Sequence, residues 1–355
     1  MARIISRKYT CQIQLWQDCN LNCSHCWRDA KYDNVKLNTD YLVNDLEKFI
    51  SHIIKIKKIV KKWFFRIQLT WWEVFLYFDK IKKIIHLLDK FPEIEIAFLT
   101  NWTIITDEHI EYLKKYKDRA VFQISIDWLE KAHESFRWNW TFKKSIKNII
   151  RLWEEWFVVW AQSVINSENY KETANLIKLF CELPIRWFSF RKMLDVWRAK
   201  DFSDENKENA ISRIMYLKYH YAILLKMKDY ISFKWKNLSL WCDSVASLYA
   251  HPELDYNIWY CHVHHNDVIW IEPNWDVFLC PRLPIKIWNI YQDWLINIHK
   301  KRYIKTYKSL FKLNKTCETC DTKQRCVWWD LCEIYNFYWN LDWHKSLICE
   351  NYDNK

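Results

Sequence analysis

The sequence predicts an α/β protein: a partial (β/α)6 TIM-type barrel followed by a small cysteine-rich C-terminal domain. Apolar, β-rich runs alternate with amphipathic helical segments up to about residue 200, which is typical of parallel βα units. From Cys261 onward the chain instead has short segments, many turns and seven of its 13 cysteines. Six units are too few to close an eight-stranded barrel, so the barrel is partial, and a doubly wound sheet is the alternative.

The predicted elements follow one another in regular order. The expected strands are Tyr9–Leu15, Phe64–Thr70, Ile94–Thr100, Val121–Asp127, Val158–Ile165 and Ile185–Arg191. Helices are expected between them over Tyr41–Val60, Phe78–Lys90, Asp107–Lys117, Phe142–Glu155 and Tyr170–Glu182, and a further one over Ile211–Lys228. These patterns predict a core domain over residues 1–220, a helical linker over 221–258 and a cysteine-rich domain over 259–355.

Composition limits the class of protein. The net charge of +11 is spread along the chain, with lysines alternating with apolar residues as on a solvated helix face, so nucleic-acid binding is not expected. No uncharged apolar run is long enough to span a membrane, and the N-terminus lacks the apolar stretch of a signal peptide. We therefore expect a cytoplasmic protein, a compartment where 13 cysteines favour metal binding over disulfides.

The chain contains no glycine and 25 tryptophans. A typical chain of this length has roughly 25 glycines. Tryptophan also follows Asn or Asp where Asn-Gly and Asp-Gly turns are usual. These pairs are Asn101-Trp102, Asp127-Trp128, Asn139-Trp140, Asn274-Trp275 and Asp342-Trp343. Our hypothesis is that most of these tryptophans are glycines, encoded by UGA codons that some bacterial lineages read as glycine.

The first cysteine group lies directly after the first predicted strand. Cys19, Cys23 and Cys26 form a C-x3-C-x2-C pattern, at a strand end where barrel proteins hold their chemistry. Three thiolates bind three of the four irons of a [4Fe–4S] cluster and leave one iron open. A zinc site completed by His25, or unrelated core cysteines, are the alternatives.

This motif resembles the cluster motif of the radical S-adenosylmethionine (SAM) enzymes, with His25 where an aromatic-type residue usually contacts the adenine of SAM. With Trp read as Gly, four further segments match that family in order. They are Thr70-Trp71-Trp72-Glu73, Thr100-Asn101-Trp102, Ser125-Ile126-Asp127-Trp128 and Asp195-Val196-Trp197-Arg198-Ala199. The resemblance implies that Glu73 accepts hydrogen bonds from the SAM ammonium and that Trp71, Trp72, Asn101, Ser125, Asp127 and Arg198 also belong to the SAM site.

The second cysteine group resembles the SPASM domain, which holds up to two auxiliary [4Fe–4S] clusters in many radical SAM enzymes. Its members are Cys261, Cys280, Cys317, Cys320, Cys326, Cys332 and Cys349. The sequence departs from the family pattern in two ways. Five residues separate Cys326 and Cys332, where the family usually has three. The family also often has a further upstream cysteine that completes the first auxiliary cluster, and only Cys242 is available for this role. A zinc ribbon is the alternative. Val268–Glu272 and Val277–Cys280 flank Asn274-Trp275, which as Asn-Gly predicts a hairpin with a primed turn.

The function implied by the resemblance is reductive cleavage of SAM to methionine and a 5′-deoxyadenosyl radical, which abstracts hydrogen from a substrate. SPASM enzymes most often modify a peptide or small protein, so a peptide maturase is the first expectation. Pro281 stands where sulfatase maturases carry Asp, which counts against that activity. A small-molecule or carbohydrate substrate, and a non-enzymatic zinc or iron–sulfur protein, are the alternatives. The resemblance also implies a low-potential electron donor such as flavodoxin or ferredoxin. Asp127, Glu134 and Arg137 are expected near the barrel mouth, and nothing marks one of them as an acid or base.

Overall fold

The structure is a computed structural model that describes residues 8–16, 18–26, 44–51, 64–70, 73–193, 198–199, 201, 210–241, 258–259 and 268–289. Contacts divide the chain into two compact units. Unit 1 comprises residues 1–20, 30–123 and 262–310, and unit 2 comprises residues 21–29, 124–261 and 311–355. Within the described residues, no helix is both long and apolar enough to cross a membrane.

Unit 1 is built on parallel strands. Its strands are β1 (Lys8–Gln14), β2 (Phe64–Thr70), β3 (Ile94–Thr100), β9 (Val268–Ile271), β10 (Asp276–Cys280) and β11 (Leu283–Asn289). They lie in the order β11-β10-β9-β1-β2-β3. β1 pairs in parallel with both β2 and β9, whereas β10 is antiparallel to its two neighbours. The sheet is therefore parallel in its βα part and antiparallel where the C-terminal hairpin joins it.

The helices of unit 1 follow the strands as the pattern predicts. They are residues 44–51, the 3-10 helix η1 (Val74–Tyr77), α2 (Phe78–Leu88) and α3 (Asp107–Lys114). α2 buries the apolar residues Ile81, Ile84, Ile85 and Leu88, spaced as on one helix face. α3 begins at a capping box, in which the Thr106 side chain accepts from the backbone N–H of His109.

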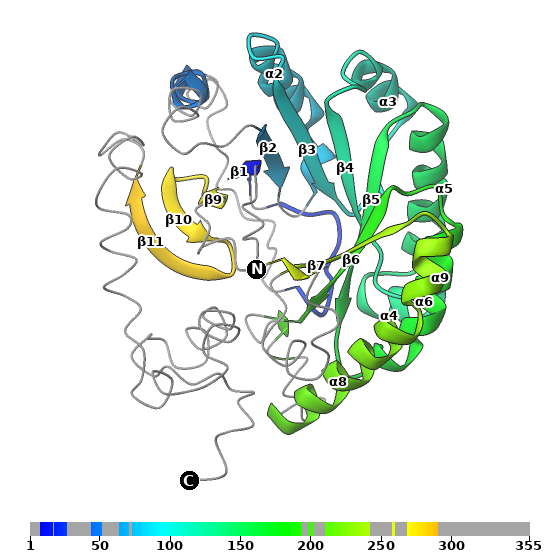
Figure 1. Ribbon diagram of the computed structural model, residues 1–355. Coiled ribbons are helices and arrows are strands. Elements are labelled where there is room, and N and C mark those ends of the chain that lie inside the picture. The colour runs from blue at the N-terminus through cyan, green and yellow to red at the C-terminus, as the bar shows by residue number, and fades with distance from the viewer. Residues whose placement is uncertain are drawn as a thin grey trace. The chain divides into compact units, whose positions relative to one another are not determined.

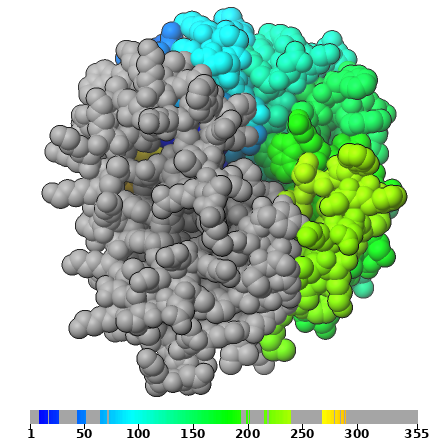
Figure 2. Space-filling view, in the orientation of Figure 1, coloured from blue at the N-terminus to red at the C-terminus, as the bar shows by residue number. Residues whose placement is uncertain are grey.

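Strand β4 (Ala120–Ser125) crosses the division between the units. Unit 2 continues with α4 (Glu130–Phe136), α5 (Thr141–Glu154), β5 (Val158–Ile165), η2 (Tyr170–Glu172), α6 (Thr173–Glu182), β6 (Trp187–Lys192), α8 (Ala210–Lys226), α9 (Lys228–Phe233), β7 (Asn237–Trp241) and β8 (Ile258–Trp259). Strands β5, β6, β7 and β8 pair in parallel in that order. Helices α5, α6, α8 and α9 lie along one side of β5 and β6 (Figure 1), and α8–α9 is part of the surface visible in Figure 2.

All six predicted strands are present, and three of them have the predicted bounds. The α/β class with a parallel sheet is confirmed. The predicted helix over Tyr170–Glu182 is split into η2 and α6. The short helix α4, whose sequence Glu-Lys-Ala-His-Glu-Ser-Phe has only a weak apolar pattern, was not expected.

The region expected to be a helical linker, residues 221–258, is not wholly helical. It holds the end of α8 and the short helix α9, and then β7, which pairs in parallel with β6. The alternating Asn-Leu-Ser-Leu-Trp sequence of β7 suits a strand. The expected domain boundary at residue 259 stays a prediction; beyond it, the buried strand β9 pairs in parallel with β1.

The hairpin joining β9 and β10 is present, but its turn differs from the expected one. Trp275 N–H donates to the Glu272 carbonyl (2.9 Å) and Glu272 N–H donates to the Asp276 carbonyl (2.9 Å). Trp275 has a φ of 66°, whereas Asn274 is not among the residues with positive φ. A primed turn needs positive φ at both central residues, so this is a turn followed by one left-handed residue.

The backbone supports the hypothesis that tryptophan stands in place of glycine. Within the described residues, every positive φ belongs to a tryptophan, at positions 102, 128, 140, 156, 235 and 275. Trp156 directly follows the last turn of α5, and Phe157 N–H donates to the Leu152 carbonyl (3.0 Å), as in a helix end closed by glycine. Trp235 closes α9 in the same way, with Lys236 N–H donating to the Ile231 carbonyl (3.1 Å). These are positions at which glycine is favoured and a bulky residue is an outlier.

Candidate functional site

In unit 1, the carboxylate of Glu73 joins the ends of strands β2 and β3. It accepts hydrogen bonds from the backbone N–H of Phe75 (3.0 Å) and of Asn101 (2.9 Å). The Thr100 hydroxyl lies 2.6 and 2.7 Å from its two oxygens. Glu73 is fully buried, and burial raises its pKa to about 7, although the donors from Thr100, Phe75 and Asn101 each lower it. These donors are all neutral, so they offset the loss of hydration only in part.

Asn101, at the end of β3, links this carboxylate to the first cysteine. Its side-chain Nδ2 lies 3.8 Å from the Sγ of Cys19 and donates to Asn20 Oδ1 (2.9 Å). Its Oδ1 accepts from the backbone N–H (2.9 Å) and the hydroxyl (2.7 Å) of Thr103. Asn20 Nδ2 donates to the same Thr103 hydroxyl (2.8 Å), which closes the network. The amide of Asn101 is thereby fixed with an N–H directed at a cysteine sulfur.

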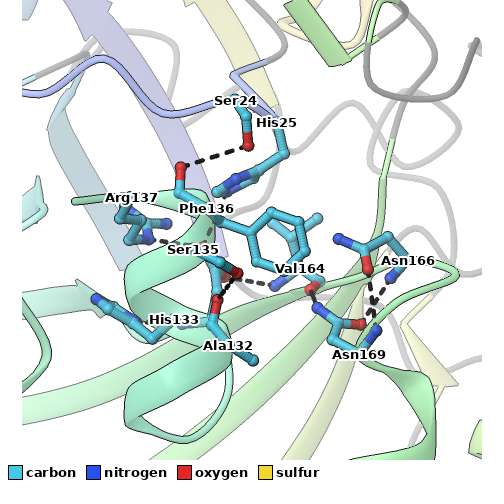
Figure 3. A network of polar contacts seen from close by, with 11 residues as sticks. Ser24, His25, Ala132, His133, Ser135, Phe136, Arg137, Val164, Asn166 and Asn169 are labelled. Atoms are coloured by element: carbon cyan, nitrogen blue, oxygen red, sulfur yellow. Dashed lines mark hydrogen bonds and ion pairs between the residues drawn. The ribbon is translucent and has the colours of Figure 1, made fainter. Parts of the chain in front are cut away.

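In unit 2, the carboxylate of Asp127 is the centre of a second network, and its partners His25, Arg137 and Val164 are labelled in Figure 3. Its Oδ1 accepts from the backbone N–H of Val164 (2.8 Å) on β5. Its Oδ2 accepts from Arg137 Nε (2.6 Å) and from His25 Nε2 (2.9 Å). Burial alone raises the pKa of Asp127, but Arg137 and His25 outweigh burial and hold this pKa well below its ordinary value. Asp127 is therefore a buried, ionised carboxylate.

His133 supports the same residue from α4. The backbone N–H of Asp127 donates to His133 Nδ1 (3.0 Å), which requires that nitrogen to be unprotonated. Burial, followed by the charge of Arg137, lowers the pKa of His133 to about 3. His133 is therefore a neutral acceptor that fixes the backbone at the end of β4.

The remaining predicted site residues are placed only in part. Ser125 ends β4 and is partly exposed, and Arg198 contacts the Asn22 side chain within the first cysteine loop. Cys280 ends β10, with the backbone N–H of Arg282 directed at its sulfur (3.5 Å). The other predicted residues lie outside the described part of the chain: Trp71, Trp72, Cys242, Cys261, Cys317, Cys320, Cys326, Cys332 and Cys349.

The cysteines of the first group suit an iron–sulfur cluster in their chemistry. Cys19, Cys23 and Cys26 are partly exposed thiols, whereas Cys11 and Cys181 are buried in the core. The Asn101 N–H near Cys19 Sγ is of the kind that stabilises a cluster thiolate. Within the described residues, no three His, Cys, Asp or Glu side chains are already gathered around one point, so the ligand set remains a prediction from the motif.

Several residues of these networks were not assigned a role from the sequence. Arg137 was expected near the barrel mouth only in general, and His133, Asn20 and Thr103 were not singled out. Arg137 reaches Asp127 from the end of α4, ten positions along the chain, and no local pattern marks such a pair. The Asn20–Thr103 bond joins residues 83 positions apart, which only the fold brings together.

Comparison with known proteins finds one matching family and two similar proteins of known name. Residues 13–180 match the Radical SAM superfamily. The chain is 25% identical over 224 residues to the antilisterial bacteriocin subtilosin biosynthesis protein AlbA of Bacillus subtilis, which covers 61% of this chain and 46% of AlbA. It is 26% identical over 195 residues to the sporulation killing factor maturation protein SkfB of the same organism, covering 54% of this chain and 44% of SkfB. The chain thus spans less than half the length of these two relatives.

Solved structures share its fold. Streptococcus suis SuiB bound to S-adenosylmethionine superposes with a TM-score of 0.71 at 16% identity, covering 97% of this chain and 77% of SuiB. The protein anSMEcpe with bound AdoMet and the Cp18Cys peptide superposes with a TM-score of 0.65 at 16% identity, covering 89% of this chain and 88% of that one. The cluster motif, the strand-end motifs and these matches agree: residues 13–180 match the Radical SAM superfamily, and the chain is similar to AlbA and SkfB in sequence and to SuiB and anSMEcpe in fold.

Proposed function

We propose that this protein is a peptide maturase that cleaves SAM reductively and uses the resulting radical to modify a peptide or small protein. The observation that carries the proposal is the order of motifs: the cysteine triad and three strand-end segments follow β1, β2, β3 and β4 in turn. AlbA is named for the biosynthesis of the bacteriocin subtilosin and SkfB for the maturation of sporulation killing factor, and structures of SuiB and anSMEcpe contain bound peptides. By analogy with these proteins, the substrate proposed for this chain is a peptide or small protein.

In this proposal Cys19, Cys23 and Cys26 hold the cluster, and the strand-end residues hold SAM. When bound, these groups supply the electron transfer and the carbon–sulfur bond cleavage that give a hydrogen-abstracting radical. The chain's own part is to fix the ligands, orient SAM and exclude water. Asn101 contacts Cys19, and Arg198 contacts Asn22. Each of them therefore helps to fix one position of the segment that carries the three cysteines.

The C-terminal cysteines are proposed to bind one or two auxiliary [4Fe–4S] clusters, and a low-potential donor such as flavodoxin or ferredoxin is proposed to supply the electron. Anaerobic reconstitution tests this. Iron should reach eight to twelve atoms per chain, because each cubane holds four. About four atoms per chain would show that the C-terminal domain binds zinc or nothing.

A Cys19/Cys23/Cys26 triple alanine variant tests the assignment of the first cluster. It should keep the C-terminal iron and lose SAM cleavage, because only the three-ligand cluster has an open iron. The measurement is 5′-deoxyadenosine formation alongside iron content. Product formed at the wild-type rate would overturn the proposal.

Glu73→Gln tests the predicted contact with the SAM ammonium. Losing a charge-assisted hydrogen bond costs roughly 1–3 kcal/mol, so SAM affinity should fall about tenfold or more while the cluster spectrum is unchanged. The carboxylate already accepts from Phe75, Thr100 and Asn101, which gives it a second role in holding β2 to β3. Unaltered SAM binding in a folded variant would leave Glu73 with that structural role alone.

A further inference from the structure

The loop that carries Cys23 and Cys26 is held in place by contacts that involve neither cysteine. The backbone N–H of Ser24 donates to the Phe136 carbonyl (2.9 Å) at the end of α4, and the Ser24 hydroxyl lies 3.5 Å from the same oxygen. The ring of His25 meets the Phe136 ring edge-on, with centroids 5.5 Å apart. Figure 3 shows Ser24 and His25 directed from their loop toward Phe136. The loop is thus docked on α4.

Phe136, on which the loop is docked, is itself held in a buried core. It is 4% exposed and packs in a small core with Met193 and Ala199, while Val164 packs against the edge. The carbonyl that receives Ser24 therefore belongs to a residue that cannot move without opening this core.

Asp127 fixes the direction of the His25 ring. His25 is 6% exposed and Asp127 is 1% exposed, so the bond from His25 Nε2 to Asp127 Oδ2 (2.9 Å) is shielded from water. Asp127 is itself held on two sides, by the Val164 backbone (2.8 Å) and by Arg137 (2.6 Å). A buried ion pair adds little net stability, because desolvation offsets the attraction. What this pair provides is a fixed acceptor for one residue of the cysteine loop.

We propose that Asp127, supported by Arg137, is a positioning residue that holds the Cys23–Cys26 loop in its ligand-binding conformation before iron arrives. The inference rests on the proposed role of Cys23 and Cys26 as cluster ligands. Ordering a loop costs conformational entropy, and a loop that is already ordered does not lose this entropy when the metal binds. His25, between the two cysteines, is the residue through which Asp127 acts.

The test uses the full-length apo protein, with glycine restored at the tryptophan positions. His25→Phe keeps a ring against Phe136 and leaves the Asp127–Arg137 pair intact, but it removes the bond to Asp127. His25→Gln keeps a side-chain donor. We expect the Ser24 amide to exchange with deuterium about tenfold faster in His25→Phe and in Asp127→Asn, and near the wild-type rate in His25→Gln. The initial rate of iron incorporation at limiting iron should be lower than in the wild type for His25→Phe and Asp127→Asn, and near the wild-type rate for His25→Gln.

Because His25→Phe keeps the buried ion pair, it should fold even if Asp127→Asn does not. Unchanged Ser24 exchange and unchanged iron incorporation in His25→Phe would overturn the inference, while full iron in the wild type would leave the proposed function standing. Conversely, the Cys19/Cys23/Cys26 triple alanine variant should keep slow Ser24 exchange although it binds no iron at the first motif. Fast exchange in that variant would show that the cysteines, and not Asp127, order the loop.

Discussion

Two buried carboxylates, Glu73 in unit 1 and Asp127 in unit 2, are built into the ends of parallel strands in opposite electrostatic ways. Glu73 is surrounded by neutral donors, and its pKa rises to about 7. Asp127 has backbone support too, but it also meets the guanidinium of Arg137, and its pKa falls well below the ordinary value. Neutral hydrogen bonds therefore do not offset the loss of hydration at Glu73, whereas Arg137 together with His25 does so at Asp127. The first carboxylate can exchange a proton near neutral pH, and the second stays charged.

The comparison of the Glu73 and Asp127 networks fails most completely if the tryptophans are authentic, because both networks lie next to such a tryptophan. Trp102 directly follows Asn101 of the first network and Trp128 directly follows Asp127, and both have positive φ and no exposure. Such a backbone costs about 1–3 kcal/mol per site, and total stability is only about 5–15 kcal/mol. Protein with tryptophan at all 25 positions should be insoluble or unable to bind SAM, whereas the glycine version should fold and bind iron.

Expression trials and a SAM-binding assay of the two versions make this comparison. Equal solubility and equal SAM binding would show that tryptophan belongs at these positions, and the motifs that need glycine would be withdrawn. Intact-mass spectrometry of the protein from its native organism is an independent check, since a mass matching 25 tryptophans contradicts the hypothesis directly.

Removing the cation from the second network should be the most damaging single change. Arg137→Met leaves Asp127 as a buried charge without its main counter-ion, which costs about 3–5 kcal/mol of the free energy of unfolding. The double variant Arg137→Met/Asp127→Asn removes the charge as well and should recover part of that loss. Urea unfolding at pH 7 measures both. If the double variant is no more stable than Arg137→Met, the charge of Asp127 is not what Arg137 balances.

The first network predicts an unusual pH dependence. The pKa of Glu73 is raised in the folded state from 4.5 to about 7, so its contribution to stability is complete below pH 4.5 and is lost as the pH rises through 7. Each pH unit in that interval is worth about 1.4 kcal/mol, on the order of 3 kcal/mol in total. Glu73→Gln should remove this part of the slope, measured by urea unfolding from pH 5 to 8.

Other buried groups provide the contrast. Burial lowers the pKa of His133 and His220 to about 3, so both favour the folded state less as the pH falls below 6.5, in wild type and variant alike. Asp127, with its lowered pKa, contributes fully above about pH 4 and loses its contribution only in more acidic solution. Asp127→Asn should therefore leave the slope between pH 5 and 8 unchanged. Identical slopes of stability against pH in the wild type and in Glu73→Gln would contradict the predicted contribution of Glu73.

The sequence predicts the positions of these carboxylates but not their surroundings. Local patterns locate β2, β3 and β4, and so place Glu73 and Asp127 at strand ends. Which side chains turn toward them depends on pairing between distant segments. Thr100 and Asn101 meet Glu73 because β3 lies beside β2, and Arg137 meets Asp127 because α4 carries it back to the segment that follows β4. Tertiary partners of this kind leave no periodic signal in one sequence.

The same limit explains the errors outside the networks. β7 is only five residues long and follows two helices, so its alternation was absorbed into an expected helical linker. The turn at Trp275 was expected to be primed because Asn-Gly usually is, but the left-handed conformation is confined to one residue. In both cases a short local pattern allows two structures, and packing against β6 or β9 selects one.

The smallest expected effect concerns the reduction potential of the first cluster. Asn101 Nδ2 lies 3.8 Å from Cys19 Sγ, and hydrogen bonds to cluster sulfurs favour the more negative, reduced state. Asn101→Leu removes this donor, so at a fixed potential the ratio of reduced to oxidised cluster should fall by up to about tenfold, which is about 59 mV for one electron. Potentiometric titration followed by EPR measures the change. Thr103→Val is the matched control, because it removes the hydroxyl bonds of Thr103 to Asn20 and to Asn101 Oδ1 but keeps the Asn101 Nδ2 donor and the bond from the Thr103 backbone N–H. A midpoint potential that is the same in Asn101→Leu as in the wild type would show that the first network positions Cys19 without influencing its electrons, and the difference between the two carboxylate networks would then be one of protonation alone.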